Sequence, residues 1–141
     1  MNQRGIANTA ALLAAAVLCG CLAPTRNTLP VTQIQTAGNY DRIASCFARR
    51  STDREIADRE LARPVLERFS NPDEIRVSQQ IGVNLMWELD FRPLDEDRTG
   101  IETRIWKPPI GGVERQAGVI DDLRACGASE AADEIGPSSR R

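Results

Sequence analysis

Three carboxylate side chains stand at polar positions of two segments in which apolar and polar residues alternate. They are Glu88, Asp90 and Glu102. Because successive side chains of a β-strand point to opposite faces of a sheet, all three are expected on one face. Two neighbouring carboxyl groups can act as acid and base in the hydrolysis of glycosides. These residues are therefore the candidate catalytic groups of a small hydrolase acting on peptidoglycan or polysaccharide.

Arginines occupy the matching polar positions of the same alternating segments. Arg76, Arg92 and Arg104 stand in register to form cross-strand pairs with the three acids. A face covered by paired charges needs no catalytic role. The simpler interpretation is a charged, solvated outer face, and hydrolysis is kept as the alternative.

An acidic loop, Asp95-Glu96-Asp97-Arg98-Thr99-Gly100, begins like the calcium-binding loop of an EF-hand. The resemblance ends at the twelfth position, where the loop has Trp106 in place of a bidentate glutamate. The segment is therefore interpreted as a hairpin loop whose glycine supplies the turn. No metal and no cofactor are expected.

Histidine is absent from the sequence, which removes the commonest general base and metal ligand. Lys107, the only lysine, precedes two prolines and has no serine spaced to form a Ser-Lys pair. The formal net charge of −2 gives no indication of nucleic-acid binding. The composition therefore favours a protein that is not an enzyme.

The segment that says most about location is residues 6–21, which read IANTAALLAAAVLCGC. Its apolar run of about a dozen residues is shorter than the ~20 that a membrane-spanning helix needs, and Arg4 precedes it. The run ends in Leu18-Cys19-Gly20-Cys21, which resembles the lipobox of bacterial lipoproteins.

This resemblance implies that Cys21 receives a diacylglyceryl group and that residues 1–20 are removed as a signal peptide. Cys21 fits the pattern because Leu18 lies three positions before it and Gly20 immediately before it. The new amino terminus would also be acylated, for example with palmitate, because stable anchoring takes more than one chain. Leu22 stands where an aspartate would favour the inner membrane, so the periplasmic face of the outer membrane is expected.

The lipoprotein assignment also determines how the cysteines are interpreted. With Cys19 removed and Cys21 lipidated, Cys46 and Cys126 remain in an oxidising compartment. We therefore expect a disulfide between them. A bridge that closes most of the folded chain should stabilise it by about 4 kcal/mol.

Composition divides the rest of the chain into three parts. Residues 21–38 comprise the lipidated residue and a Thr-, Pro- and Gln-rich stretch without periodicity, which predicts a flexible tether. Residues 128–141 are small and polar, which predicts a disordered tail. Residues 39–127 then form a single domain.

Helical spacing of apolar residues predicts three helices in that domain. Asn39 is positioned to cap the first, which carries Cys46 and ends at residues 49–51. A capping box from Thr52 to Glu55 opens a short second helix that Pro64 limits. The last helix spans about residues 112–126 and carries Val119, Ile120 and Leu123 on its apolar stripe.

Alternation predicts strands at residues 75–81, 83–91 and 101–105, with a turn at Asn71-Pro72-Asp73. Strict alternation indicates an antiparallel sheet with one buried and one solvated face. The expected fold is α+β, with a small antiparallel sheet of about three strands. The N-terminal and C-terminal helices pack on one face and the disulfide ties them together.

Met86 and Trp106 fall on the polar face by the same alternation, whereas Trp87 falls on the apolar face. Exposed Met and Trp side chains often mark a contact site, so these two form a candidate contact face. The expected function is a membrane-anchored, non-catalytic accessory or binding module of the cell envelope. Its expected partners are the membrane, through the lipid on Cys21, and another envelope protein or peptidoglycan.

Overall fold

The structure is a computed structural model that describes residues 23–57, 62–108 and 112–136. Their helices and strands, in chain order, are β1 (Val31–Ala37), α2 (Tyr40–Ala57), β2 (Val65–Ser70), β3 (Asp73–Ile81), β4 (Asn84–Pro93), β5 (Arg98–Ile105), α3 (Gly112–Ala125) and α4 (Ser129–Ile135). The fold is α+β, as predicted. The signal peptide and Cys21 lie outside the described residues.

The sheet has five strands, all antiparallel, in the order β1-β5-β4-β3-β2. Strands β2 to β5 are joined in sequence as a meander, and β1 lies at the edge beside the last strand. The prediction of about three strands covered β3, β4 and β5. It omitted the two edge strands, β1 and β2.

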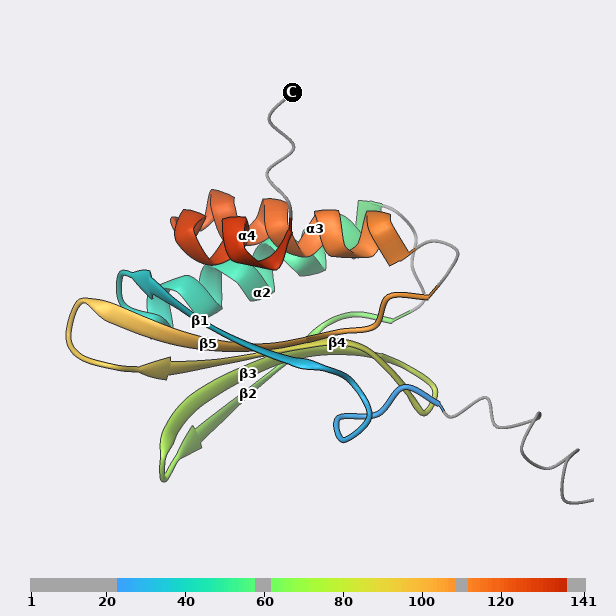
Figure 1. Ribbon diagram of the computed structural model, residues 1–141, viewed down its shortest axis with the longest axis horizontal. Coiled ribbons are helices and arrows are strands. Elements are labelled where there is room, and N and C mark those ends of the chain that lie inside the picture. The colour runs from blue at the N-terminus through green and yellow to red at the C-terminus, as the bar shows by residue number, and fades with distance from the viewer. Residues whose placement is uncertain (1–22, 58–61, 109–111, 137–141) are drawn as a thin grey trace, which may run out of the picture.

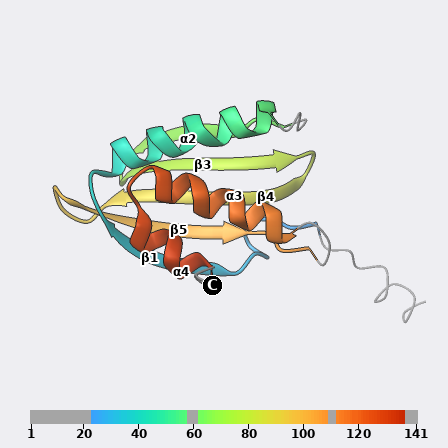
Figure 2. The same ribbon diagram turned by 90° about the horizontal axis from the view of Figure 1, so that it is seen from above.

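All three helices lie on one face of the sheet (Figure 1). Seen from above, α2 lies over the β3 side and α3 and α4 over the β5 and β1 side (Figure 2). The core between the layers includes Phe47 of α2, Trp87, Leu89 and Phe91 of β4, and Leu123 of α3, all of them 0% exposed. The other face of the sheet carries no helix among the described residues.

Helix α2 begins at the predicted cap, because the Asn39 Oδ1 accepts hydrogen bonds from the backbone N–H groups of Asp41 and Arg42, both at 3.1 Å. The predicted disulfide between Cys46 and Cys126 is present and ties α2 to the chain after α3, with 5.8 Å between the two Cα atoms. Both features hold the helical layer together.

Helix α2 is continuous through the point where two helices were predicted. Ser51 is buried, and its hydroxyl donates to Asp122 of α3 at 3.0 Å. The Thr52 hydroxyl donates to the Ala48 carbonyl at 2.8 Å. Because both polar side chains find partners without leaving the helix, the capping box at Thr52 does not start a new one.

The prediction of a flexible tether over residues 21–38 was wrong for its described part. Residues 31–37 form β1, in which Ile34 pairs with Ile101 on the buried face. The preceding residues 23–30 contain the buried Pro24 and Leu29. Its two buried residues are Ile34 and Thr36, so the sequence of the strand lacks the alternation of apolar and polar residues on which the prediction relied.

The prediction of a disordered tail over residues 128–141 was also wrong for its described part. Residues Ser129–Ile135 form α4, in which Ala131 and Ala132 are fully buried. Gln116 of α3 donates to the Ile135 carbonyl at 2.6 Å. Small residues let α4 pack closely against α3 and β1, and a small-residue composition does not distinguish such a helix from a tail.

Strand β4 has a register irregularity that changes which side chains face the core. Gln79 pairs with Trp87 and Gln80 with Leu85, so Met86 lies between two paired residues. This β-bulge reverses the alternation on its amino-terminal side. As a result Met86 belongs to the core, whereas Leu85 is buried outside the core cluster.

Candidate functional site

The uncovered face of the sheet carries a cluster of eight charged residues that we call the polar-face cluster. Its members are Arg26, Glu74, Arg76, Glu88, Asp90, Arg92, Glu102 and Arg104. Seven of them stand on β3, β4 and β5, and all of these except Glu74 occupy positions where alternation predicted a polar face. The cluster contains as many arginines as carboxylates.

Asp90 lies at the centre of this cluster and is fully buried. Its carboxylate accepts hydrogen bonds from Arg76 Nε at 2.7 Å, Arg26 Nη2 at 2.8 Å and Arg104 Nη1 at 3.1 Å. Glu88 is 4% exposed and accepts from Arg26 Nε at 2.6 Å and Arg104 Nη1 at 3.2 Å. The three guanidinium groups therefore enclose both acids.

The predicted cross-strand pairing of arginines with carboxylates is confirmed. Besides its bonds to Glu88 and Asp90, Arg104 forms an ion pair with Glu102. Arg92 Nε donates to Glu74 at 2.5 Å, and its Nη1 lies 3.8 Å from Glu102.

Arg26 is the one member of the polar-face cluster that does not come from the sheet. It stands in a turn that Thr25 closes with Thr28 and Leu29, whose N–H groups both donate to the Thr25 carbonyl at 3.1 Å. The N–H of Leu85, at the start of β4, donates to the Pro24 carbonyl at 2.7 Å. The N-terminal segment is thereby fixed across the sheet at one end of the polar face, as the blue turn in Figure 1 shows.

Burial lowers the pKa values of the arginines in the polar-face cluster, whereas hydrogen bonds to carboxylates raise them. Its hydrogen bond to Glu88 contributes most to raising the pKa of Arg26. Burial alone would lower the pKa of Arg76, but its bond to Asp90 and the nearby carboxylates raise it. The bond to Glu74 raises the pKa of Arg92. All three remain cations, as their partners require.

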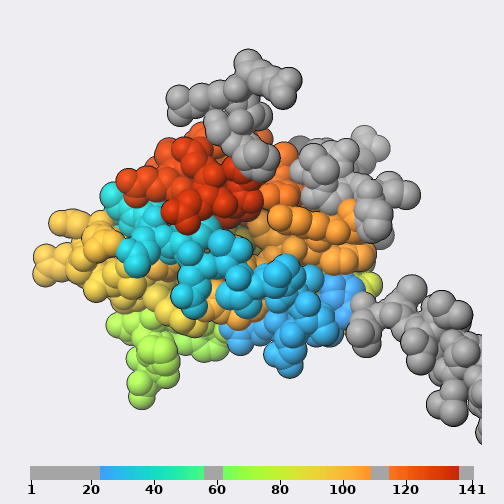
Figure 3. Space-filling view, in the orientation of Figure 1, coloured from blue at the N-terminus to red at the C-terminus, as the bar shows by residue number. Residues whose placement is uncertain are grey.

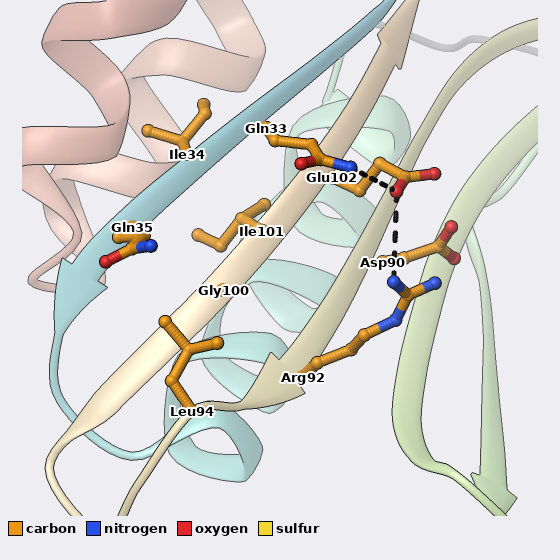
Figure 4. A pocket seen from close by; sticks show the side chains of 9 residues that line it. All are labelled: Gln33, Ile34, Gln35, Asp90, Arg92, Leu94, Gly100, Ile101 and Glu102. Carbon is orange, nitrogen blue, oxygen red and sulfur yellow. Dashed lines mark hydrogen bonds and ion pairs between the residues drawn. The ribbon is translucent and has the colours of Figure 1, made fainter.

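A groove with a volume of about 310 Å³ opens beside the cluster, over β1, β5 and the end of β4. Figure 4 shows its lining, which is Gln33, Ile34, Gln35, Asp90, Arg92, Leu94, Gly100, Ile101 and Glu102. Gly100 keeps the floor of the groove open, because any other residue would crowd Leu94 there. A Cβ atom at position 100 would lie 3.2 Å from Leu94 Cδ2. The groove presents amide, carboxylate and guanidinium groups around a small apolar patch.

This arrangement suits binding better than hydrolysis. Glycoside hydrolysis needs one carboxyl that gives up a proton to the substrate and a second that reaches the sugar or a water. In this cluster guanidinium groups already occupy the oxygens of Glu88 and Asp90. Glu102 is engaged by Arg104 and also accepts from Gln33 Nε2 at 3.4 Å.

Residues 95–97 of the acidic segment lie in the loop between β4 and β5, as predicted. The expectation that its glycine supplies the turn was wrong, because Gly100 lies in β5, where it pairs with Gln35 and Arg92. The N–H of Leu94 donates to the Arg98 carbonyl at 3.0 Å and that of Asp97 to the Asp95 side chain at 3.0 Å. In the part of the chain that the structure describes, no three His, Cys, Asp or Glu side chains are grouped to hold a metal ion.

The placement of Met86 and Trp106 on the polar face was wrong. Met86 is 5% exposed and belongs to the core cluster, because the bulge in β4 turns it toward the helices. Trp106 is half-buried against the same core, and the guanidinium of Arg115 in α3 lies 5.7 Å from the centre of its ring. The two residues therefore form no contact face on the polar side of the sheet.

A second charged group, which sequence reasoning missed, joins α2 to α3. Asp122 is 4% exposed and accepts from Ser51 and Arg54, with Arg50 Nε at 3.6 Å from it. Burial raises the pKa of Asp122, and these three partners only partly offset that effect. Asp122 follows the acidic residue Asp121 in sequence, so charge pattern alone gave no sign that it is buried.

None of the described helices combines the length and the hydrophobicity that a membrane-spanning helix requires. Cys21, the expected lipidation site, lies outside the described part of the chain. Comparison with known proteins finds no family model, no curated protein and no solved structure that matches this chain.

Proposed function

We propose that this protein is a lipid-anchored accessory protein of the bacterial cell envelope that binds another envelope protein through the polar face of its sheet. Lipidation at Cys21 would hold it at the membrane, on the periplasmic face of the outer membrane. It acts by binding and requires no cofactor.

Two independent features support export. The lipobox at residues 18–21 directs lipidation and secretion. The disulfide between Cys46 and Cys126 suits an oxidising compartment, since such bonds are rare in the cytosol. A cytosolic protein would rarely combine the two.

The observation that carries the binding assignment is the groove beside the polar-face cluster. The amides of Gln33 and Gln35 and the guanidinium of Arg92 can donate to a partner, the Glu102 carboxylate can accept, and the exposed Leu94 offers apolar contact. The arginine partners of Glu88 and Asp90 hold these side chains in place, so the surface is organised before a partner arrives. The catalytic alternative lacks such support, because those carboxylates are already engaged.

The anchor is tested by replacing Cys21 with serine in the full-length protein. Cys21→Ser should abolish incorporation of labelled palmitate and release the protein from the membrane fraction. Cys19→Ser should leave both unchanged, because Cys19 lies within the removed signal. Labelling that persists in Cys21→Ser would contradict the assignment.

The binding surface is tested by filling the groove at Gly100. Gly100→Thr adds a side chain at the floor, and Leu94, exposed on its loop, can move aside. A photo-crosslinking residue at Gln33, at the groove margin, should capture an envelope protein in intact cells. Gly100→Thr should reduce that adduct several-fold, while the control Ser70→Thr, at the far edge of the sheet, should not.

Equal crosslinking in Gly100→Thr and Ser70→Thr would show that the groove is not the binding surface. Release of soluble fragments from peptidoglycan by the purified protein, lost in Glu88→Gln, would instead establish the hydrolase alternative. A crosslink to glycan in place of protein would replace the protein partner by the cell wall.

A further inference from the structure

The two ends of the sheet differ sharply in chemistry. Because the strands are antiparallel, one end gathers the starts of β1, β2 and β4 with the ends of β3 and β5. We call this the anchor-side end and define it by Val31, Val65, Val83, Trp106 and Lys107. The opposite end carries the β2–β3 turn and the β4–β5 loop.

The anchor-side end is where the N-terminal segment is docked. The Pro24 carbonyl accepts the N–H of Leu85 at the start of β4, close to the β3–β4 turn. Figure 1 shows the start of the described chain beside that turn. Cys21 precedes Pro24 by three residues, which span at most about 10 Å when fully extended. A lipid on Cys21 therefore cannot lie far from this end of the sheet.

Among the described residues, the exposed tips of this end are apolar and carry no acidic side chain. Val83 in the β3–β4 turn is 82% exposed, Val65 56% and Val31 49%. These are three of the five large hydrophobic side chains that the described residues expose. No charged residue occurs between Val77 and Trp87.

In the described part of the chain two exposed basic residues flank it, and Trp106 is partly exposed nearby. Lys107 follows β5, and Arg63 precedes β2. Tryptophan is enriched at membrane interfaces, and lysine and arginine are attracted to anionic lipid headgroups. Apolar tips, a tryptophan and basic flanks are the combination that a bilayer surface accepts.

The opposite end is acidic, although it also exposes two large hydrophobic side chains, Phe69 and Leu94. Asp95, Glu96 and Asp97 lie in the β4–β5 loop, all exposed, and Asp73 begins β3. This loop projects at the left of Figure 3, away from the start of the described chain. Anionic headgroups would repel it.

We propose that the anchor-side end is a membrane-contact surface, so that the domain stands on the bilayer with the β3–β4 turn toward it and the acidic loop away from it. The occupant of this surface is the bilayer that holds the lipid on Cys21, so the inference rests on the proposed anchor. Val83 and Trp106 contact the headgroup region, and the short span from Cys21 to Pro24 keeps them there. The groove and polar-face cluster then lie side-on to the membrane, where a neighbouring envelope protein can reach them.

Tryptophan quenching by brominated lipids tests this orientation. Full-length protein with its native lipid is reconstituted into vesicles of phosphatidylethanolamine and phosphatidylglycerol, with and without bromine on the acyl chains. Trp106→Phe leaves the buried Trp87 as background. In that background Val83→Trp places a probe at the anchor-side end, and Leu94→Trp places a matched probe beside the acidic loop, where Leu94 is 47% exposed.

The probe at position 83 should be quenched several-fold more than the probe at position 94, which should match the Trp87 background. Wild type should also be quenched more than Trp106→Phe, a measurement that needs no added probe. Equal quenching at 83 and 94, or stronger quenching at 94, would overturn the orientation while leaving the anchor intact. A mass spectrum without acyl chains, with protein that fails to float with the vesicles, would instead overturn the anchor and with it the contact surface.

Discussion

Asp90→Asn is the sharpest test of the polar-face cluster. The side chain is nearly isosteric, so packing is unchanged, but the charge that three guanidinium groups share is lost. The amide also directs an N–H₂ group toward cations that offer no acceptor. The cluster, balanced in the native protein, would hold one more positive than negative charge.

The magnitude follows from burial. Arg76 and Arg104 are 19% and 10% exposed, and Asp90 is fully buried, so these pairs behave as buried ones. Removing one partner of a buried pair costs about 3–5 kcal/mol. Arg26 is 43% exposed, so its own pair contributes only about 0–1 kcal/mol. Against a typical net stability of about 5–15 kcal/mol, the loss is large.

Urea denaturation followed by tryptophan fluorescence measures this loss, with the disulfide intact. Asp95→Asn is the matched control, since Asp95 lies on an exposed loop and should change stability by less than about 0.5 kcal/mol. A double-mutant cycle that combines Asp90→Asn with Arg76→Gln should give a non-zero coupling energy, because Arg76→Gln should cost less stability once Asp90 has been neutralised. If Asp90→Asn cost no more than Asp95→Asn, the cluster would be a solvated surface network and the argument from burial would fail.

Three further changes test other parts of the structure. Replacing Cys46 and Cys126 together by serine should lower the free energy of unfolding by about 4 kcal/mol, because the bridge closes a separation of 80 residues; denaturation of the variant should match that of the reduced wild type. Because its pKa is raised in the folded protein, Asp122 binds its proton more tightly when the chain is folded. The wild type should therefore lose stability as the pH rises from 3.8, the ordinary pKa of aspartate, through the raised pKa of the folded state. Asp122→Asn should therefore gain stability relative to wild type across that range in urea titrations, and a difference that does not vary with pH would contradict this. Met86→Ala should lower the free energy of unfolding by about 2–4 kcal/mol, measured by thermal or urea denaturation. An unchanged stability would contradict the placement of Met86 in the core.

The sequence allowed prediction of those elements in which periodicity and burial coincide. Asn39 identified the start of α2, and alternation located β3 and β5 together with most of β4. The glycine turn was the exception, because Val83 was included in the strand although it lies in the turn after Gly82, whose φ is +61°. Residue type alone does not distinguish a valine in such a turn from a valine in a strand.

The edge strands were missed for a different physical reason. In β2, Leu66 is half-buried and the other five residues are exposed, so no apolar stripe stands out. The pairing of such a strand is set by its neighbour in the sheet, which a local pattern does not contain.

The error at Met86 has the same origin. Alternation counts positions along one strand, whereas a bulge is defined by the register between two strands. Beyond the bulge, Leu85 and Met86 were therefore assigned to the wrong faces. The sheet members of the polar-face cluster other than Glu74 were predictable, because they lie on the other side of that irregularity. Glu74 lies before the point at which the strand was predicted to begin. Arg26 was not predictable either, because it comes from a segment that composition marked as a tether.

The position of β1 beside β5 predicts that this strand joins the sheet late. Val31 pairs with Arg104, so the first strand of the described chain cannot join the sheet until the last has been made. The β2 to β5 meander needs only local turns and can form first, whereas β1 must close a long loop, which slows its pairing. Arg26 meets its partners on β4 in the same late step. Substitutions in β1 or at Arg26 should therefore speed unfolding while leaving the folding rate nearly unchanged.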